Sequence, residues 1–368
     1  MRVLVPSVCL CFSLVGLGCG DAGSSSSDPG GSGGHADGAG GEGATTGTGA
    51  GGEGAAGSGG MDEGGAAPQG VEAFVAVGWG GRRLASCDGG MTWIGDVEAA
   101  PESDDDWHKP YTPKHLAYGD GRFVFLTGWG NDSTVHVSTD GVSWTSTQLS
   151  TTYGGVGHDG ARFLLVGNRE LAESTDEGLT WPALTDPKST YDRAAAAFAG
   201  VMVAGADGNV ETLREGTNSW QPLASCQGTR HGHIGFQGGF AAGGGILLSL
   251  GHDGDTCAME IATGNDLGAG TINAPVRFRP SYFDGAFQVA TGDTLHQSSD
   301  GVSWTSTPIQ GAQLHQIVKG PGGHYVGLNE STSDLYYSAD GSSWTQAQAP
   351  DGNGFLYLAA GALDSCGP

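Results

Sequence analysis

Basic and imidazole side chains recur at one place relative to a series of short glycine turns. Those that lie six or seven residues before a turn glycine are Lys114, His115, Arg193, His231, Arg279 and His315. Lys, Arg and His together make up 26 of the 368 residues, so about one is expected by chance at the fourteen positions of this kind. Grouped cations attract anions and hold them with charge-assisted hydrogen bonds. We therefore expect these side chains to bind an anionic ligand, such as a carboxylate sugar or an acidic glycan.

Two tryptophans occupy a second place that suits ligand binding. Trp79 and Trp129 each stand between two glycines, in corresponding loops of the chain. An aromatic ring in an open, glycine-flanked loop stacks well on the face of a sugar, so both are candidate ligand-binding residues. The alternative is that each ring packs on a neighbouring element.

The sequence predicts neither a metal site nor a cofactor. The acidic run Asp104-Asp105-Asp106 is typical of a solvated loop, and calcium binding there is the alternative. His231 and His233 have no third ligand at a fixed spacing, so they do not match a zinc site. No nucleophile or acid/base pair stands out, and the catalytic residues, if there are any, stay unassigned.

Composition restricts the class of partner. The chain has 15 Lys and Arg against 40 Asp and Glu, for a net charge of −25. Nucleic acids and anionic membrane surfaces bind proteins that offer positive charge, so the balance argues against both. Glycine is abundant at 70 residues, yet 38% of the chain is apolar, which is enough for a folded part. We expect that part to be a monomer that binds a glycan or a protein.

We expect the first 70 residues to contain a signal peptide followed by a linker. Residues 1–18 have one arginine and an apolar stretch too short to span a bilayer, as a signal peptide does. The segment ends Val15-Gly16-Leu17-Gly18-Cys19 and resembles the lipobox of bacterial lipoproteins, with Gly16 where the family usually has Leu. The resemblance implies a lipid on Cys19 and a place in the cell envelope of a Gram-negative-type bacterium, at the outer membrane or the cell surface. The alternative is a secreted protein cut near Gly20.

Residues 19–70 are rich in Gly, Ser and Ala and cannot bury enough apolar surface to fold, so we expect a disordered linker. The cysteines agree with an oxidising compartment. Cys9 and Cys11 belong to the signal, which leaves Cys87, Cys226, Cys257 and Cys366 after Cys19. Four cysteines predict two disulfides, and spacing alone leaves three pairings open.

From residue 71 onward one short pattern recurs, of the form S-x-D-x-G-x-T-W or one residue shorter. Its five good copies place Asp88, Asp140, Asp176, Asp300 and Asp340 before Trp93, Trp144, Trp181, Trp304 and Trp344, and a worn copy ends at Trp220. Ser and Asp side chains bond nearby backbone amides and Gly takes a positive φ, which predicts a tight turn between two strands. A further, hidden copy is expected near Gly264 to Gly268.

These motifs resemble the Asp box, or BNR repeat, of the sialidase-like propellers, in which the boxes are structural. The spacing of the tryptophans predicts an all-β fold: a seven-bladed β-propeller of four-stranded blades over residues 71–368. In the first blade we expect strands at Val71 to Val77, Leu84 to Ser86 and Thr92 to Ile94. The strand Gly354 to Ala359 has no blade of its own, so it should complete the first one.

That closure brings Cys366 near Cys87, so we pair these two, and pair Cys226 with Cys257 across neighbouring blades. A sialidase needs three arginines, a tyrosine nucleophile with a glutamate, and usually an Arg-Ile-Pro motif. The nearest match is Phe278-Arg279-Pro280, far from the first blade. We therefore expect a non-catalytic binding propeller on a lipoprotein. A sialidase-like glycoside hydrolase is the alternative, and a mainly structural surface protein is the second alternative.

Overall fold

In the computed structural model, the described residues are 70–97, 111–128, 132–167, 170–184, 194–198, 200–206, 209–214, 217, 219–226, 239–251, 253–272 and 279–367. The expected signal peptide, Cys19, the tether and the acidic loop at Asp104 to Asp106 lie outside these ranges. Within the ranges there is no helix with the length and apolarity needed to cross a membrane.

The described residues form seven antiparallel sheets of four strands each. Sheet I contains β28 (Phe355–Leu363), β1 (Val71–Gly78), β2 (Arg83–Ser86) and β3 (Ile94–Val97). Sheet II contains β4 (Pro113–Gly119), β5 (Arg122–Thr127), β6 (Ser133–Ser138) and β7 (Thr145–Leu149). Sheet III contains β8 (Tyr153–His158), β9 (Phe163–Gly167), β10 (Leu171–Ser174) and β11 (Ala183–Leu184).

Sheet IV contains β12 (Ala194–Phe198), β13 (Val201–Ala206), β14 (Asn209–Arg214) and β15 (Gln221–Pro222). Sheet V contains β16 (Gly239–Gly243), β17 (Ile246–Leu250), β18 (Asp255–Glu260) and β19 (Asp266–Thr271). Sheet VI contains β20 (Ser281–Phe283), β21 (Ala286–Thr291), β22 (Thr294–Ser298) and β23 (Thr305–Pro308). Sheet VII contains β24 (Gln316–Lys319), β25 (Tyr325–Asn329), β26 (Asp334–Ser338) and β27 (Thr345–Gln346). Two short 3₁₀ turns, η1 (Trp79–Gly81) and η2 (Ala224–Cys226), follow β1 and β15.

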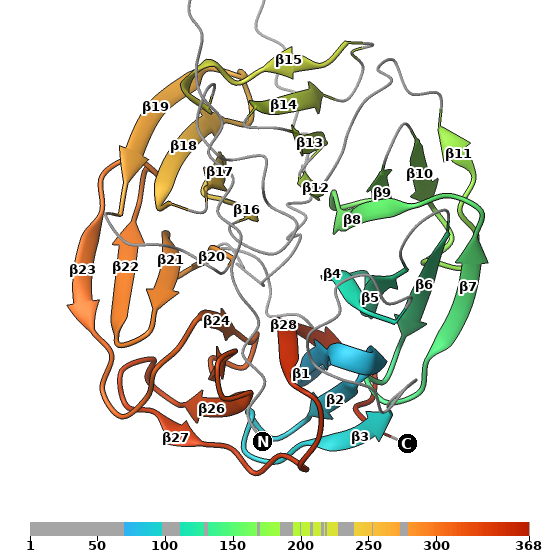
Figure 1. Cartoon of the computed structure of the whole chain (residues 1–368), viewed down its shortest axis with the longest axis vertical. Helices are drawn as coiled ribbons and strands as arrows, with labels where there is room; N and C mark the ends of the chain where they lie inside the picture. Colours follow the sequence, from blue (N-terminus) through green and yellow to red (C-terminus); the bar gives the residue numbers. More distant parts are fainter. Residues whose placement is uncertain are drawn as a thin grey trace, which may run out of the picture. The chain divides into compact units, whose positions relative to one another are not determined.

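The sheets stand around a central axis as the blades of a β-propeller (Figure 1). Their innermost strands are β28, β4, β8, β12, β16, β20 and β24, and each contacts the innermost strand of the next sheet. The last of these contacts, between β24 and β28, closes the ring. The N-terminal ends of the innermost strands therefore meet around the axis, at one end of the ring.

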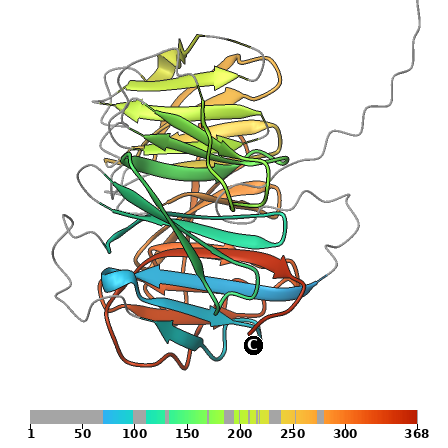
Figure 2. The same ribbon diagram turned by 90° about the vertical axis from the view of Figure 1, so that its right-hand side faces the viewer.

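The C-terminal strand completes sheet I, as the missing inner strand of the first repeat led us to expect. β28 pairs with β1 from Val71↔Leu363 to Val77↔Tyr357 (Figure 2). β28 extends four residues beyond the predicted end at Ala359, because β1 offers it backbone partners along its whole length.

Two other sequence-based limits need correction. β3 begins at Ile94 rather than Thr92, because the Thr92 amide and hydroxyl bond the Asp88 carboxylate and belong to the turn. The hidden motif expected near Gly264 to Gly268 is a hairpin turn of another kind: the carboxylate of Glu260, at the end of β18, accepts from the Thr263 hydroxyl, and no tryptophan follows.

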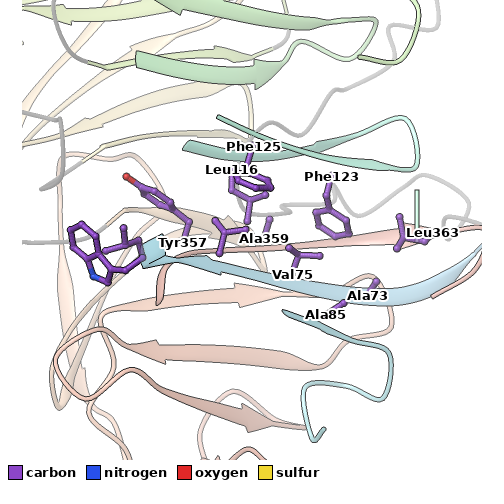
Figure 3. Close-up of a cluster of buried hydrophobic side chains, with 12 residues drawn as sticks. Ala73, Val75, Ala85, Leu116, Phe123, Phe125, Tyr357, Ala359 and Leu363 are labelled. Carbon is purple, nitrogen blue, oxygen red and sulfur yellow. The ribbon is translucent and has the colours of Figure 1, made fainter. Parts of the chain in front are cut away.

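The core is divided into apolar clusters between neighbouring sheets. The cluster between sheets I and II is built from alternate residues of β1, β5 and β28, whose side chains point to the same side of each strand (Figure 3). Phe123 and Phe125 of β5 are fully buried against Val75 of β1 and Ala359 of β28. Removing such side chains from water is the main stabilising force between blades.

Small residues near the axis let aromatic rings of one sheet rest on the backbone of the sheet before it. A Cβ atom added at any of three inner-strand glycines would overlap the ring of the next sheet. The pairs are Gly361 with Tyr118, Gly119 with His158, and Gly243 with Tyr282. The spacing of neighbouring blades is therefore set by glycine at these places.

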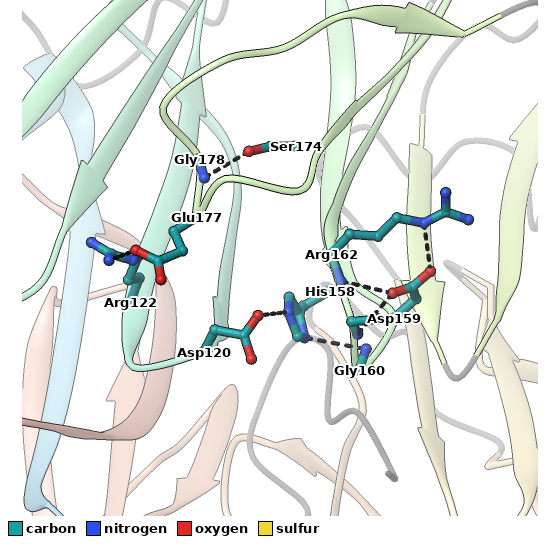
Figure 4. Close-up of polar contacts among 10 residues, drawn as sticks. Asp120, Arg122, His158, Asp159, Gly160, Arg162, Ser174, Glu177 and Gly178 are labelled. Carbon is teal, nitrogen blue, oxygen red and sulfur yellow. Dashed lines mark hydrogen bonds and ion pairs between the residues drawn. The ribbon is translucent and has the colours of Figure 1, made fainter. Parts of the chain in front are cut away.

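Polar contacts also join sheets II and III (Figure 4). His158 Nε2 lies 2.9 Å from Asp120 Oδ2 although the His158 side chain is almost fully buried. Arg122 of sheet II forms an ion pair with Glu177, which lies in the turn after β10. These contacts fix sheets II and III to each other at the C-terminal ends of their innermost strands.

Candidate functional site

Arg279 reaches across the middle of the ring. It lies two residues before β20 of sheet VI, and its Nη2 donates to the Lys114 carbonyl in β4 of sheet II at 3.3 Å. Its guanidinium carbon lies 4.1 Å from the centre of the Tyr357 ring in β28. Sheets VII and I stand between sheets VI and II around the ring, so these contacts bridge the axis rather than a blade interface. We call Lys114, His115, Arg279 and Tyr357 the channel cluster.

The Arg279 guanidinium has no anionic partner among the described residues. A carbonyl and an aromatic ring face are its contacts, and no described carboxylate lies within ion-pair distance. Burial lowers the pKa of Arg279, while contact with Tyr357 opposes that shift. An arginine stays charged even so. Arg279 is partly exposed whereas Tyr357 is only 5% exposed, so the cation and not the tyrosine faces the solvent.

The ammonium group of Lys114 loses its proton at a lower pH than that of an ordinary lysine. Its side chain is 7% exposed, and burial lowers its pKa to about 8. The ammonium form still dominates at pH 7, but the balance lies close to physiological pH. A nearby anion would favour the charged form and raise this pKa.

His115 is a neutral imidazole rather than one of the cations that the sequence suggested. Burial and the positive charge of Arg279 lower its pKa well below 6.5, against a hydrogen bond to the Val156 backbone that raises it. Its ring centre is 6.4 Å from that of Tyr357. Nδ1 is buried and has no hydrogen-bond partner in the described part of the chain. Nε2 therefore bonds Val156, and Nδ1 is left as an acceptor.

Of the six predicted basic residues, the structure brings the side chains of His115 and Arg279 together and places the backbone carbonyl of Lys114 beside Arg279. His315 is in sheet VII, where its Nδ1 accepts a hydrogen bond from the Glu330 amide at 3.1 Å, which is a structural role. Arg193, His231 and Trp129 fall outside the described ranges, as does the acidic loop.

Trp79 does not present its ring to a ligand, contrary to the sugar-stacking hypothesis. It is 9% exposed and belongs to the apolar cluster between sheets I and II. Its amide donates to the Gly354 carbonyl at 2.8 Å, and Asn353 Nδ2 donates to its carbonyl at 3.3 Å. The alternative reading, a tryptophan packed on its neighbours, describes it.

The repeated Ser-Asp-Gly-Trp motifs hold turns, as their residue types predict. In the first copy, Ser86 Oγ donates to Asp88 at 2.9 Å and accepts from the Gly90 amide at 3.0 Å. Trp93 Nε1 then donates to the Gly90 carbonyl at 3.0 Å, which sets the indole over the turn. The equivalent serine–aspartate contact recurs at Asp140, Asp176, Asp300 and Asp340. Trp144 and Trp181 repeat the indole bond, whereas Trp304 bonds Thr256 and Trp344 is 7% exposed in the core.

Both predicted disulfides form. Cys87 pairs with Cys366 and Cys226 with Cys257, with Cα–Cα distances of 5.7 and 5.6 Å. The first ties the C-terminus to sheet I, and the second ties η2, after sheet IV, to β18 of sheet V. Disulfides of this kind are typical of oxidising compartments outside the cytoplasm.

No metal site is visible in the described ranges: no three His, Cys, Asp or Glu side chains there lie close enough together to hold an ion. Sequence reasoning missed Tyr357 as a member of the site. Tyr357 lies in the strand predicted to close the ring, and its inward direction depends on the register of β28 against β1. Only an exact register would have assigned it to the axis.

Comparisons with known proteins show the fold alone. No family model matches the chain, and no curated protein sequence matches it. Among solved structures, streptogramin B lyase is similar with a TM-score of 0.51 and 10% identity, over 67% of this chain and 90% of that one. YCF48 bound to D1 peptide gives 0.45 and 14%, over 63% and 77%. BamB from Moraxella catarrhalis gives 0.42 and 13%, over 76% and 88%. The likeness to streptogramin B lyase agrees with the β-propeller fold, and at these identities no comparison bears on a ligand.

Proposed function

We propose that this chain is a non-catalytic binding protein whose propeller holds an anionic ligand at the channel cluster. The observation that carries the proposal is Arg279, a charged guanidinium at the axis with no described carboxylate beside it. A solvent-facing guanidinium that rests on an aromatic ring and has no described carboxylate beside it is available to an anion from solution.

The chemistry of the cluster favours a carboxylate that has a hydroxyl group nearby. A guanidinium binds a carboxylate with two parallel hydrogen bonds. We propose that the ammonium of Lys114, the residue before His115 in β4, adds a second positive charge. The unpartnered His115 Nδ1 accepts a hydrogen bond, which a ligand hydroxyl would donate. An acidic sugar has both groups, so we favour an acidic glycan over an acidic protein segment.

We infer a position in the cell from the N-terminal segment. We propose that Cys19 carries a lipid and that residues 20–70 hold the propeller away from the membrane of the cell envelope. The two disulfides support an extracytoplasmic location. An inhibitor of the lipoprotein signal peptidase and a Cys19→Ser variant test the anchor. The proposal requires that the inhibitor leave a lipid-labelled precursor of higher mass and that Cys19→Ser lose the label; secretion without labelling in the wild type would contradict it.

Titration of the disulfide-intact chain with glucuronate, sialic acid and an acidic peptide tests the ligand. We expect salt-sensitive binding of an acidic sugar that is at least about tenfold weaker in Arg279→Gln, since a charged hydrogen-bonded contact is lost. Arg162→Gln is the matched control, because Arg162 pairs with Asp159 and Glu173 in sheet III. Equal losses in both variants, or no binding by the wild type, would refute the proposal.

One observation favours a glycoside hydrolase as the second candidate. Tyr357 lies under Arg279, and its pKa is raised by burial and by the nearby Glu330 carboxylate, while Arg279 lowers it. A tyrosine with an adjacent glutamate is the pair that sialidase-like chemistry needs. Fluorogenic glycosides separate the two functions: turnover that is lost in Tyr357→Phe while ligand binding remains would make the chain an enzyme.

A further inference from the structure

A recess lies between sheets VI and VII. Its volume is about 100 Å³, and its lining includes Asp284, Gln288, Gln297, Tyr325 and Asp340. Asp284 lies in the turn between β20 and β21, whereas Asp340 lies in the turn after β26. The two glutamines face each other across β21 and β22. The recess is therefore bounded by polar groups from both sheets.

Gln288 breaks the apolar pattern of the blades. In five other sheets the residue at the same place of the second strand, facing the next blade, is Val75, Val124, Leu164, Leu248 or Val326. Gln288 is only 3% exposed, and its Oε1 has no hydrogen-bond partner in the described part of the chain. A buried carbonyl without a donor destabilises a fold, so its place in the recess calls for an explanation.

A second buried glutamine shows what a purely structural role looks like. Gln316 of β24 is 4% exposed; its Nε2 donates to the Leu358 carbonyl and its Oε1 accepts from the Leu358 amide, both at 3.0 Å. Both polar atoms are satisfied, and they link sheet VII to β28. Gln288 makes one long contact of this kind, from Nε2 to the Phe283 carbonyl at 3.5 Å. The Oε1 acceptor of Gln288 is therefore the atom that has no hydrogen-bond partner in the described part of the chain.

The lining offers acceptors and negative charge. Asp340 is held ionised, because the amides of Ser343 and Ser342 lower its pKa. At the Asp284 end the chain supplies a cation of its own: Lys319 Nζ pairs with Asp284 and lies 5.2 Å from the centre of the Tyr325 ring. A carboxylate beside an aromatic face is a general cation-binding arrangement. One lysine against two carboxylates leaves the recess with a net negative charge.

We propose that this recess binds a small organic cation, an alkylguanidinium or alkylammonium group. Such a group donates several hydrogen bonds, which Gln288 Oε1 and Asp340 accept, and its charge offsets the excess carboxylate. The volume suits the head of an arginine or lysine side chain better than a whole sugar. The cation has two possible sources, a free amine or a side chain of a partner protein, and the experiment includes both.

The test is a titration of the full chain with methylguanidinium. Binding is monitored through the side-chain amide signals of Gln288 and Gln297 in NMR spectra. Urea at equal concentration is the matched control ligand, since it has a similar shape and donors but no charge. We expect shifts with methylguanidinium and none with urea, and at least about tenfold weaker affinity in Gln288→Val. An arginine-containing peptide that competes identifies a side chain as the source, whereas one that does not compete identifies a free amine.

The Gln288→Val variant gives sheet VI the valine that sheets I, II and VII have at the same position. We therefore expect this variant to fold at least as stably as the wild type. Gln288→Glu is the converse variant and should bind methylguanidinium more tightly. Gln316→Val should unfold more readily yet, where it folds, bind the cation as the wild type does. The proposal is wrong if methylguanidinium shifts no recess signal, if urea shifts the same signals equally, or if Gln288→Val binds with unchanged affinity.

Discussion

The buried Lys114 makes ligand binding depend on pH in a range where few other groups titrate. Burial lowers the pKa of Lys114 to about 8, so the ammonium form falls from about nine-tenths at pH 7 to about one-tenth at pH 9. If the anionic ligand binds only the charged form, affinity should fall about tenfold between these two pH values. An ordinary lysine would lose almost no charge over that range.

The sign follows from the direction of the shift. Lys114 is charged below its folded pKa, so binding should be constant from pH 6 to 7 and weaken as the pH rises through 8. Bound anion raises this pKa, and the complex therefore takes up protons near pH 8. The stability of the free protein should move the other way, because the unfolded chain holds that proton more tightly, and should increase from pH 8 upward.

Calorimetric titration with glucuronate at fixed ionic strength measures the effect, since salt itself weakens such binding. Lys114→Arg is the matched control: arginine keeps its charge throughout, so its affinity should change little between pH 7 and pH 9. A tenfold loss that persists in Lys114→Arg would assign the titration to another group. A wild-type affinity that does not change with pH would refute the role of Lys114 altogether.

Three further predictions concern the frame that holds the site. Replacing Cys87 and Cys366 with alanine should lower the free energy of unfolding in urea by up to about 5–6 kcal/mol, since their bond closes a loop with a sequence separation of 279; an unchanged midpoint would contradict the ring-closure role. Asp300, whose pKa is lowered to about 2 by the amides of Ser303 and Val302 against the opposing effect of burial, should stabilise the fold above pH 4 and lose that contribution as the pH falls toward 2; thermal melts of Asp300→Asn should lack this acid dependence. Trp79→Ala should cost about 3–5 kcal/mol of stability, as for other buried aromatic residues, and leave ligand affinity unchanged in the folded fraction, whereas a selective loss of affinity would restore the sugar-stacking hypothesis.

Local chemistry explains what was predictable from the sequence. The serine, aspartate and glycine of each repeat form their turn from residues two to four positions apart, so the motif specifies the geometry without help from the rest of the fold. The orphan inner strand at the C-terminus could be recognised because its repeat lacked one. Both disulfide pairings then followed from which ends the ring must bring together.

The arrangement of residues at the axis was predictable only in part. Turn spacing places Lys114, His115 and Arg279 at the starts of inner strands, but not which of them meet. That Arg279 crosses from sheet VI to Tyr357 and Lys114 depends on strand register and on side-chain length across the ring. That His115 is neutral depends on burial, which belongs to the packed structure.

The amino-acid sequence by itself determined the strands, the turns, the disulfides and the presence of basic residues near the axis, because each of these is encoded by neighbours in the chain or by a repeated spacing. Only the tertiary structure decided which cations keep their charge, which tryptophan is buried and which glutamine lacks a donor. Those properties arise from groups far apart in the chain, whose desolvation and hydrogen bonds exist only after the sheets have packed into a ring.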